Sequence, residues 1–189
     1  PFHSRVLVFG LFACAFNLLL GFGGLMSFGH AMFFGVGAYV TAHTAKEWGL
    51  SPEFAIACGL LGALALGLVV AAVAIRKRGI AFAMVTLALA QMLYFIWLQV
   101  PFTHGEDGIQ AVPRGKLFGL IDLNDQFALY FFILACFVLT YCAIYRFVQS
   151  PFGLALEALR DNEARAVSLG HNPDLYKLFV LIASALVAG

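Results

Sequence analysis

The sequence predicts an all-α, polytopic transmembrane helix bundle that contains a broken or re-entrant glycine-rich segment and a structured cytoplasmic loop. The first observation is composition: of 189 residues, 62% are hydrophobic and 11% are charged, whereas soluble domains average about 45–50% apolar and about 25% charged residues. The second is that the charges are bunched into short stretches separated by long uncharged runs. A soluble fold would expose apolar surface that it could not hide, and a lipid bilayer removes that difficulty.

Five or six apolar runs are expected to cross the bilayer, within a single transmembrane domain over residues 1–189. Their approximate bounds are 5–22, 28–45, 54–75, 80–100, 127–145 and 178–189. The last run is shorter than the roughly 20 residues that a helical crossing needs. The chain also has no initiator Met, so we expect a fragment of a longer protein, cut at both ends, whose final span is truncated.

The connection between the first two runs, Gly21–His30, is rich in glycine and aromatic residues. A turn exposed to water normally carries Asp, Asn, Lys or Pro. Non-helical backbone at membrane depth is tolerated only where protein or a water-filled cavity covers it. We therefore expect a broken helix or a tight re-entrant turn buried in the bundle, with an ordinary short loop as the alternative.

The run 54–75 carries a small side chain at every fourth position. Residues at this spacing lie on one helical face, and small residues let helix backbones approach closely in lipid. The stripe therefore predicts helix packing through Gly59, Ala63 and Gly67, flanked by Ala55 and Ala71.

The basic residues predict the orientation of the bundle. Loops 76–78 and 146–177 lie on the same side, because two crossings separate them. Cytoplasmic loops carry an excess of Lys and Arg, so we expect both loops to be cytoplasmic. Their basic residues are Arg76, Lys77, Arg78, Arg146, Arg160, Arg165 and Lys177, against Arg5, Lys46, Arg114 and Lys116 on the other side.

Residues 146–177 have the signals of ordered short helices. Ser150-Pro151 is typical of a helix start, and the segment 154–160 has high helix propensity. A second helix fits 163–169, ended by Gly170, and Asn172-Pro173 begins a third that enters the membrane. We expect the first two helices to bury their apolar side chains, which are Leu156, Leu159, Val167 and Leu169. We expect them to present their charged side chains to solvent or to a partner, and these are Glu157, Arg160, Asp161, Glu163 and Arg165.

These loop helices favour docking into a groove on a soluble partner. The alternative is an amphipathic helix lying among lipid headgroups, which favours Lys and Arg on its polar face. In this loop acidic and basic residues are balanced, which favours the protein partner.

Three sequence blocks resemble the permease subunits of branched-chain amino acid ABC importers of the LivM type. The blocks are Gly24–Tyr39, Arg78–Met92 followed by Thr103–Ile109, and Ser150–Gly170 followed by Tyr176–Leu178. Together they span nearly the whole chain, and the third is the most specific. The chain departs from the family pattern at Leu154, where a basic residue is expected, and at Ile80-Ala81, which replaces a more usual aromatic pairing.

The resemblance implies a permease subunit in a bacterial inner (cell) membrane that moves branched-chain or related amino acids into the cytoplasm. Its partners would be two ABC ATPase subunits, a second related permease and a periplasmic or extracellular solute-binding protein, with no nucleic acid. The chain holds no G-x-x-x-x-G-K-[ST] motif, so it is not expected to be an enzyme or to hold a cofactor. In this family 157–170 would be the coupling helix that enters the ATPase groove, with coupling residues Glu157, Ala158, Arg160, Asp161, Asn162, Glu163, Arg165 and Gly170.

Polar side chains within the spans are candidates for the translocation pathway. We select Ser27, His30, Thr86 and Gln91, which flank the glycine-rich segment or lie in the second matching block. For Thr86 the alternative is a hydroxyl bonded to its own helix. A metal at His30 is disfavoured, because no second His or carboxylate lies at ligand spacing.

The sequence is also compatible with other functions. A permease of the same family could carry urea, amides or aromatic acids. An ion- or proton-coupled secondary transporter would also have broken helices, but no Asp, Glu, Lys or Arg lies at mid-span. A channel or membrane scaffold would leave the ordered loop without a role.

Overall fold

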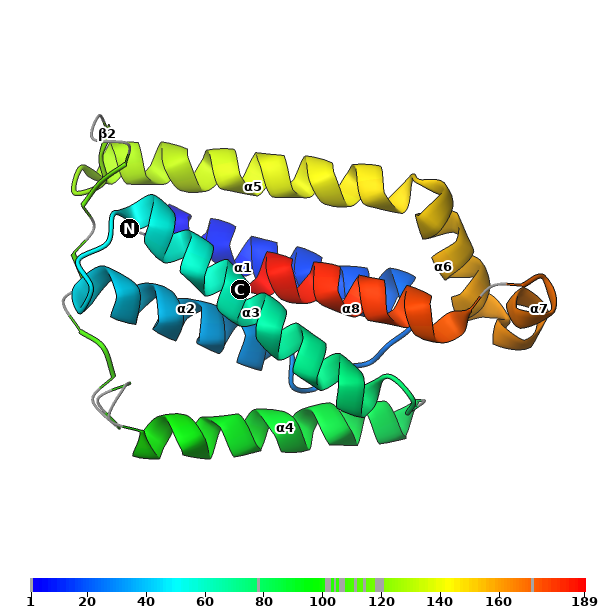
Figure 1. Cartoon of the computed structure of the whole chain (residues 1–189). Helices are drawn as coiled ribbons and strands as arrows, with labels where there is room; N and C mark the ends of the chain where they lie inside the picture. Colours follow the sequence, from blue (N-terminus) through cyan, green and yellow to red (C-terminus); the bar gives the residue numbers. More distant parts are fainter. Residues whose placement is uncertain are drawn as a thin grey trace.

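The computed structural model describes residues 2–77, 79–100, 103, 105, 108–110, 112–113, 115–117, 121–170 and 172–189. It is a bundle of helices with one short ladder of strands (Figure 1). The elements are α1 (Phe2–Asn17), the π-helical turn η1 (Leu18–Phe22), α2 (Ala31–Lys46), α3 (Pro52–Ala74), α4 (Ile80–Gln99), β1 (Lys116–Leu117), β2 (Ile121–Asp122), α5 (Gln126–Val148), α6 (Pro151–Asp161), α7 (Glu163–Ser168) and α8 (Pro173–Ala188). The two strands pair antiparallel, and the all-α prediction is confirmed.

Four helical segments in the described part of the chain are long and apolar enough to cross a membrane: Phe2–Phe22, Pro52–Ala74, Ile80–Gln99 and Gln126–Val148. The helices α2 and α8 have 16 residues each, which corresponds to about 24 Å against a hydrocarbon core of about 30 Å. Helix α2 begins at Ala31, three residues after the expected start of its run. Helix α8 begins at Pro173, five residues before the expected start of its run at 178.

Helix α3 packs against α2 and α8. The stripe of small residues lies at these contacts. A Cβ on Gly59 would overlap the hydroxyl of Thr41 on α2, and a Cβ on Gly67 would lie 3.1 Å from the Cβ of Ala185 on α8. Ala63 between them is fully buried. Close backbone approach at this junction therefore requires small residues.

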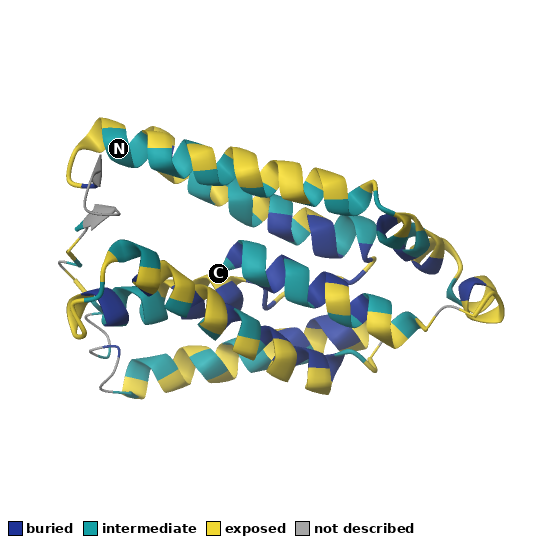
Figure 2. Ribbon diagram, turned by 45° about the horizontal axis from the view of Figure 1, so that its top comes forward, coloured by how far each residue is buried: buried dark blue, intermediate teal, exposed yellow. Residues whose placement is uncertain are grey.

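Helix α5 lies at the edge of the bundle. It contacts α1 and α6, and none of its 23 residues is buried, although all of them are described. Figure 2 shows it at the top with intermediate and exposed residues, whereas dark blue gathers on the helices below. The apolar outer face of α5 is suited to lipid or to another apolar helix.

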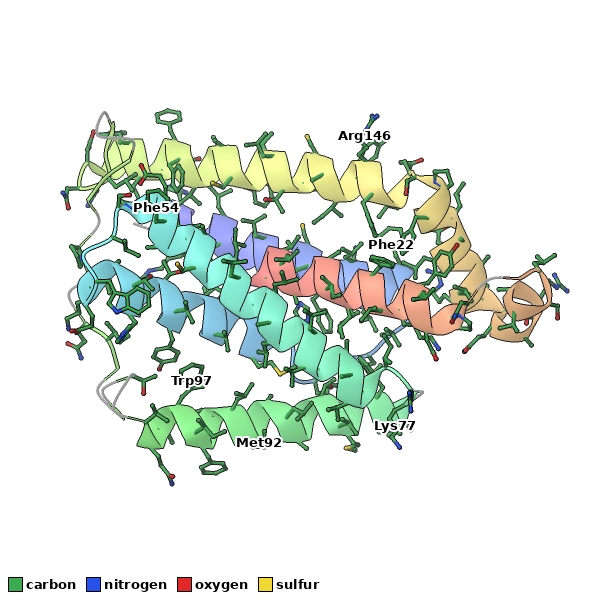
Figure 3. The ribbon with its side chains drawn as sticks, in the orientation of Figure 1. Phe22, Phe54, Lys77, Met92, Trp97 and Arg146 are labelled. Carbon is green, nitrogen blue, oxygen red and sulfur yellow. The ribbon has the colours of Figure 1, made fainter. Side chains whose placement is uncertain are left out.

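The two ends of the bundle differ in content. Figure 1 places η1, the turn between α3 and α4, and the helices α6 and α7 at one end, and the strands with the turn between α2 and α3 at the other. Lys77 and Arg146, both labelled in Figure 3, lie at the first end. Loops 76–78 and 146–177 therefore lie at the same end of the bundle, as the two crossings between them predict. Arg78 and Arg114, two of the basic residues used for the orientation, lie outside the described residues.

Candidate functional site: loop helices and glycine-rich break

A short corner joins α5 to α6. The Ser150 hydroxyl donates to the Phe147 carbonyl oxygen at 2.6 Å and accepts from the Gly153 N–H at 3.4 Å, so one side chain bonds to both helices. A Cβ on Gly153 would overlap the Val148 carbonyl oxygen, which leaves room only for glycine. The expected cap at Ser150 is therefore present, and it fixes the angle at which α6 leaves α5.

Two more caps shape the rest of the loop. The Asn162 side chain accepts from the Arg165 N–H at 3.0 Å and starts α7, while the Asn172 side chain accepts from the Asp174 N–H at 3.2 Å and starts α8. Gly170 follows α7 with φ +90°, the left-handed region that glycine adopts without strain. The predicted helix boundaries in the loop thus agree closely with the structure.

The buried face of the loop differs from the prediction in α7. Leu156 and Leu159 of α6 are buried as expected. The expectation that Val167 and Leu169 are buried is wrong, because they are 50% and 75% exposed. Helix α7 buries Ala166 instead and projects beyond the bundle (Figure 1), where there is little protein surface to cover larger side chains.

The predicted coupling residues divide into two groups. One group is exposed, comprising Ala158, Asp161, Asn162, Arg165 and Gly170. The other turns toward the protein: Glu157 lines a pocket of about 310 Å³ with Asn17 and Gln149, and Glu163 forms an ion pair with Lys177 at 3.1 Å. Arg160 is also exposed, with 40% of its side chain accessible, but its guanidinium reaches back to the bundle, where Nη1 donates to the Gly21 carbonyl oxygen.

The glycine-rich segment is a break between α1 and α2. Its backbone leaves the helix through η1, turns at Gly24 with φ +64°, and becomes helical again at Ala31. Ser27 and His30 in this segment are each 2% exposed. The expected break is therefore present, but it is only partly buried, because Gly24, Met26 and Phe28 are exposed.

His30 lies in a cage of aromatic rings at the end of the break. The ring centroids of Phe12, Phe16 and Phe33 are 5.4–5.7 Å from its own. Its Nε2 lies 3.3 Å from the Ser184 hydroxyl. That hydroxyl donates to the carbonyl oxygen of Ala15 at 2.5 Å, so it accepts from His30. Sequence analysis did not select Ser184, because its partners are far away along the chain.

Two buried polar atoms at the break have no hydrogen-bond partner within the described residues, namely the Ser27 hydroxyl and the His30 Nδ1. Buried polar groups are usually paired. Unpaired groups beside non-helical backbone are therefore available to a polar ligand or to water. No group of three or more His, Cys, Asp or Glu residues that could hold a metal occurs in the part of the chain that the structure describes.

The other two pathway candidates lie on α4. Thr86 is fully buried, and its hydroxyl donates to the Ala83 carbonyl oxygen at 2.9 Å within the same helix. A Cβ on Gly29 would overlap the Thr86 carbonyl oxygen, so the break packs directly on α4 at this point. The structure thus gathers Ser27, His30 and Thr86 around the break and leaves Gln91 exposed farther along α4.

Gln91 lines a groove of about 310 Å³ between α2 and α4. The groove begins at Phe28 in the break, and its walls include Tyr39 and Trp97, whose rings stack at 5.3 Å with an interplanar angle of 16°. Figure 3 shows Trp97 on the side of α4 that faces α2. Sequence analysis missed this aromatic pair, because neither ring stands out in an aromatic-rich chain.

Comparison with known proteins gives a consistent result. The sequence model of the family described as "Branched-chain amino acid transport system / permease component" matches residues 2–189. Two curated relatives, from Escherichia coli K12 and Salmonella typhimurium, are each called "High-affinity branched-chain amino acid transport system permease protein LivM". Each is 29% identical over 209 aligned residues, which cover 98% of this chain and 49% of the relative. The chain therefore spans about half the length of these relatives. No solved structure is significantly similar to it.

Proposed function

This chain belongs to the branched-chain amino acid transport system permease family, and we propose that it is a membrane-spanning permease subunit of an ATP-driven importer for branched-chain or related amino acids. Its partners are two separate ABC ATPases, a second related permease and a solute-binding protein outside the cell. The complex lies in a bacterial inner (cell) membrane. The end of the bundle that carries both Lys77 and the loop helices faces the cytoplasm, which agrees with the excess of basic residues there.

The single observation that supports this proposal best is the projecting pair of helices α6 and α7 (Figure 1). Their exposed tip combines apolar and charged side chains, with Val167 and Leu169 beside Asp161 and Arg165. A helix that carries exposed apolar residues at the end of a rigid loop is suited to a groove on a soluble protein. In the proposed complex this tip docks on the ATPase.

The mechanism follows from the rigidity of the loop. Nucleotide binding draws the two ATPases together, and the docked tip moves with them. The corner at Ser150 passes this movement to α5, and the ion pair between Glu163 and Lys177 passes it to α8. Tilting of these helices then changes the side of the membrane from which the pathway is open.

The solute pathway is proposed to run past the glycine-rich break. The unpaired atoms of Ser27 and His30 and the amide of Gln91 offer hydrogen bonds, and the aromatic walls of the neighbouring groove suit an aliphatic side chain. The hydroxyl of Thr86 is bonded within its own helix. We therefore assign Thr86 to the packing of the break on α4.

A charge-reversal pair tests the docking assignment. Arg165→Glu alters an exposed residue of α7, and Lys46→Glu makes the same change in an exposed residue at the opposite end of the bundle. We expect Arg165→Glu to reduce co-purification of the ATPases from detergent extracts, and Lys46→Glu to leave it unchanged. Equal ATPase recovery with Arg165→Glu and the unaltered chain would refute the docking surface.

A further inference from the structure

Arg160 makes contacts that differ from those of an ordinary docking residue. Its Nη1 donates to the carbonyl oxygen of Gly21, which is 139 positions away along the chain. Its Nε and Nη2 both donate to Asp161 Oδ1, at 3.1 and 3.0 Å. The neighbouring carboxylate thus holds the guanidinium in the orientation that reaches Gly21.

Gly21 lies where the first transmembrane helix ends. The N–H groups of Gly23, Gly24 and Leu25 donate to the carbonyl oxygens of Leu18, Leu20 and Leu19, respectively. The Gly21 carbonyl, next in order, accepts from Arg160. A cation at a helix C-terminus also interacts favourably with the helix dipole. Arg160 therefore acts as a C-terminal cap, supplied by a distant helix, for the helix that the break interrupts.

The break is shaped to receive this side chain. A Cβ on Gly24 would lie 2.7 Å from Cγ of Arg160, and Gly24 has φ +64°. Glycine at this position therefore allows the left-handed turn and also leaves room for the Arg160 side chain. Beneath the stem, Leu156 of α6 is buried in the same core cluster as Leu19 and Leu25. One polar and one apolar contact together bind α6 to the break.

From the break, further contacts reach the helices around the proposed pathway. Gly29 packs on α4 at Thr86, His30 bonds to Ser184 of α8, and Phe28 forms one end of the groove that holds Gln91. A displacement of residues 21–30 would therefore disturb α4, α8 and the groove at once.

We propose that Arg160 is a positioning residue that transmits movement of α6 to the glycine-rich break, and that it does not belong to the ATPase docking surface. The proposal rests on the proposed function, since it assumes an ATPase that moves α6. It assigns opposite roles to two arginines of the same loop. Arg160 contacts the glycine-rich break beside the membrane pathway, whereas Arg165 contacts the ATPase.

The test compares Arg160→Gln and Arg160→Lys with Arg165→Gln in the complete complex, reconstituted with its ATPases and binding protein. Three quantities are measured: ATPase co-purification, solute imported per ATP hydrolysed, and amide hydrogen exchange over residues 18–30 with and without nucleotide. We expect Arg160→Gln to retain its ATPases and to import at least about fivefold less solute per ATP, a usual size for allosteric coupling. Its nucleotide-dependent change in exchange over 18–30 should be lost.

The other variants make the result specific. Arg160→Lys can still reach one carbonyl but cannot fork onto Asp161, so its import per ATP should lie between those of the glutamine variant and the unaltered chain. It also serves as the decisive variant if Arg160→Gln does not fold. Arg165→Gln should instead lose ATPase recovery, with normal import per ATP in the complexes that remain.

Two outcomes would overturn the inference. One is loss of ATPase recovery in the Arg160 variants to the same degree as in Arg165→Gln, which would place Arg160 in the docking surface. The other is an unchanged exchange response over residues 18–30 together with normal import per ATP. Failure of the unaltered chain to recover any ATPase would refute the proposed function instead, so the two failures are distinguishable.

Discussion

The ion pair between Glu163 and Lys177 allows a sharp prediction, because the two partners are buried to different degrees. The Lys177 Nζ lies 3.1 Å from Glu163 Oε1, and the side chains are 11% and 24% exposed, respectively. Lys177 lies near the start of α8, against the core, while Glu163 is the first residue of α7. Neutralising either partner leaves the other charged, and the more buried charge is the more costly to strand.

The expected magnitudes follow from this asymmetry. Glu163→Gln removes the counter-charge of the buried ammonium, although the amide oxygen can still accept from it, and should lower the free energy of unfolding by about 2 kcal/mol. Lys177→Met leaves a carboxylate that water can still reach, and it buries an apolar chain, so about 1 kcal/mol is expected. The double variant should lie within about 1 kcal/mol of the unaltered chain, because no unpaired charge remains.

The assay is reversible unfolding by sodium dodecyl sulfate in mixed micelles, followed by far-UV circular dichroism, for all four members of the double-mutant cycle. The control is Lys46→Met, which removes an exposed lysine at the opposite end of the bundle and should change stability by less than about 0.5 kcal/mol. A larger loss in Lys177→Met than in Glu163→Gln would refute the reasoning from burial. A coupling energy near zero would refute the ion pair itself.

Four further substitutions test packing and pairing. Gly59→Ala should lower the free energy of unfolding by about 1–3 kcal/mol through overpacking against α2, whereas Gly35→Ala, whose Cβ meets nothing within 4 Å, should raise it by about 0.4–1 kcal/mol; equal effects would contradict the packing. Ser184→Ala should cost about 1–2 kcal/mol because it strands the Nε2 of His30, and exchange of the amides near the break reports the loosening. Thr86→Val should leave solute uptake unchanged, since its hydroxyl is bonded within its own helix; a clear fall in uptake would show that this hydroxyl reaches the solute.

Local sequence signals were sufficient for most of the fold. The caps at Ser150 and Asn172 are short-range hydrogen bonds between a side chain and the next turn, so the loop helices could be placed within a residue or two. The stripe through Gly59 likewise depends on a single periodicity. The depth at which α2 begins was less predictable, because an apolar run does not reveal where its helix starts within the membrane.

The errors and omissions at the site have a common physical origin. Helix α7 has six residues, fewer than two turns, so its apolar pattern cannot fix a buried face, and Val167 was misplaced. The inward turn of Arg160 depends on a carbonyl 139 positions away, and Ser184 depends on His30 at a separation of 154. Such contacts are set by the packing of whole helices, for which a single sequence gives no local signal.

The corner between α5 and α6 converts a small rocking into a large excursion. Ser150 is bonded on both sides of it and Gly153 lies against Val148, so the two helices turn as one body rather than about a swivel. Helix α5 has 23 residues and is therefore about 35 Å long. A tilt of about 10° imposed at the corner would carry the far end of this helix sideways by about 6 Å. Neighbouring helix axes lie about 8–10 Å apart, so this displacement is more than half of one interhelical spacing at the opposite face of the membrane.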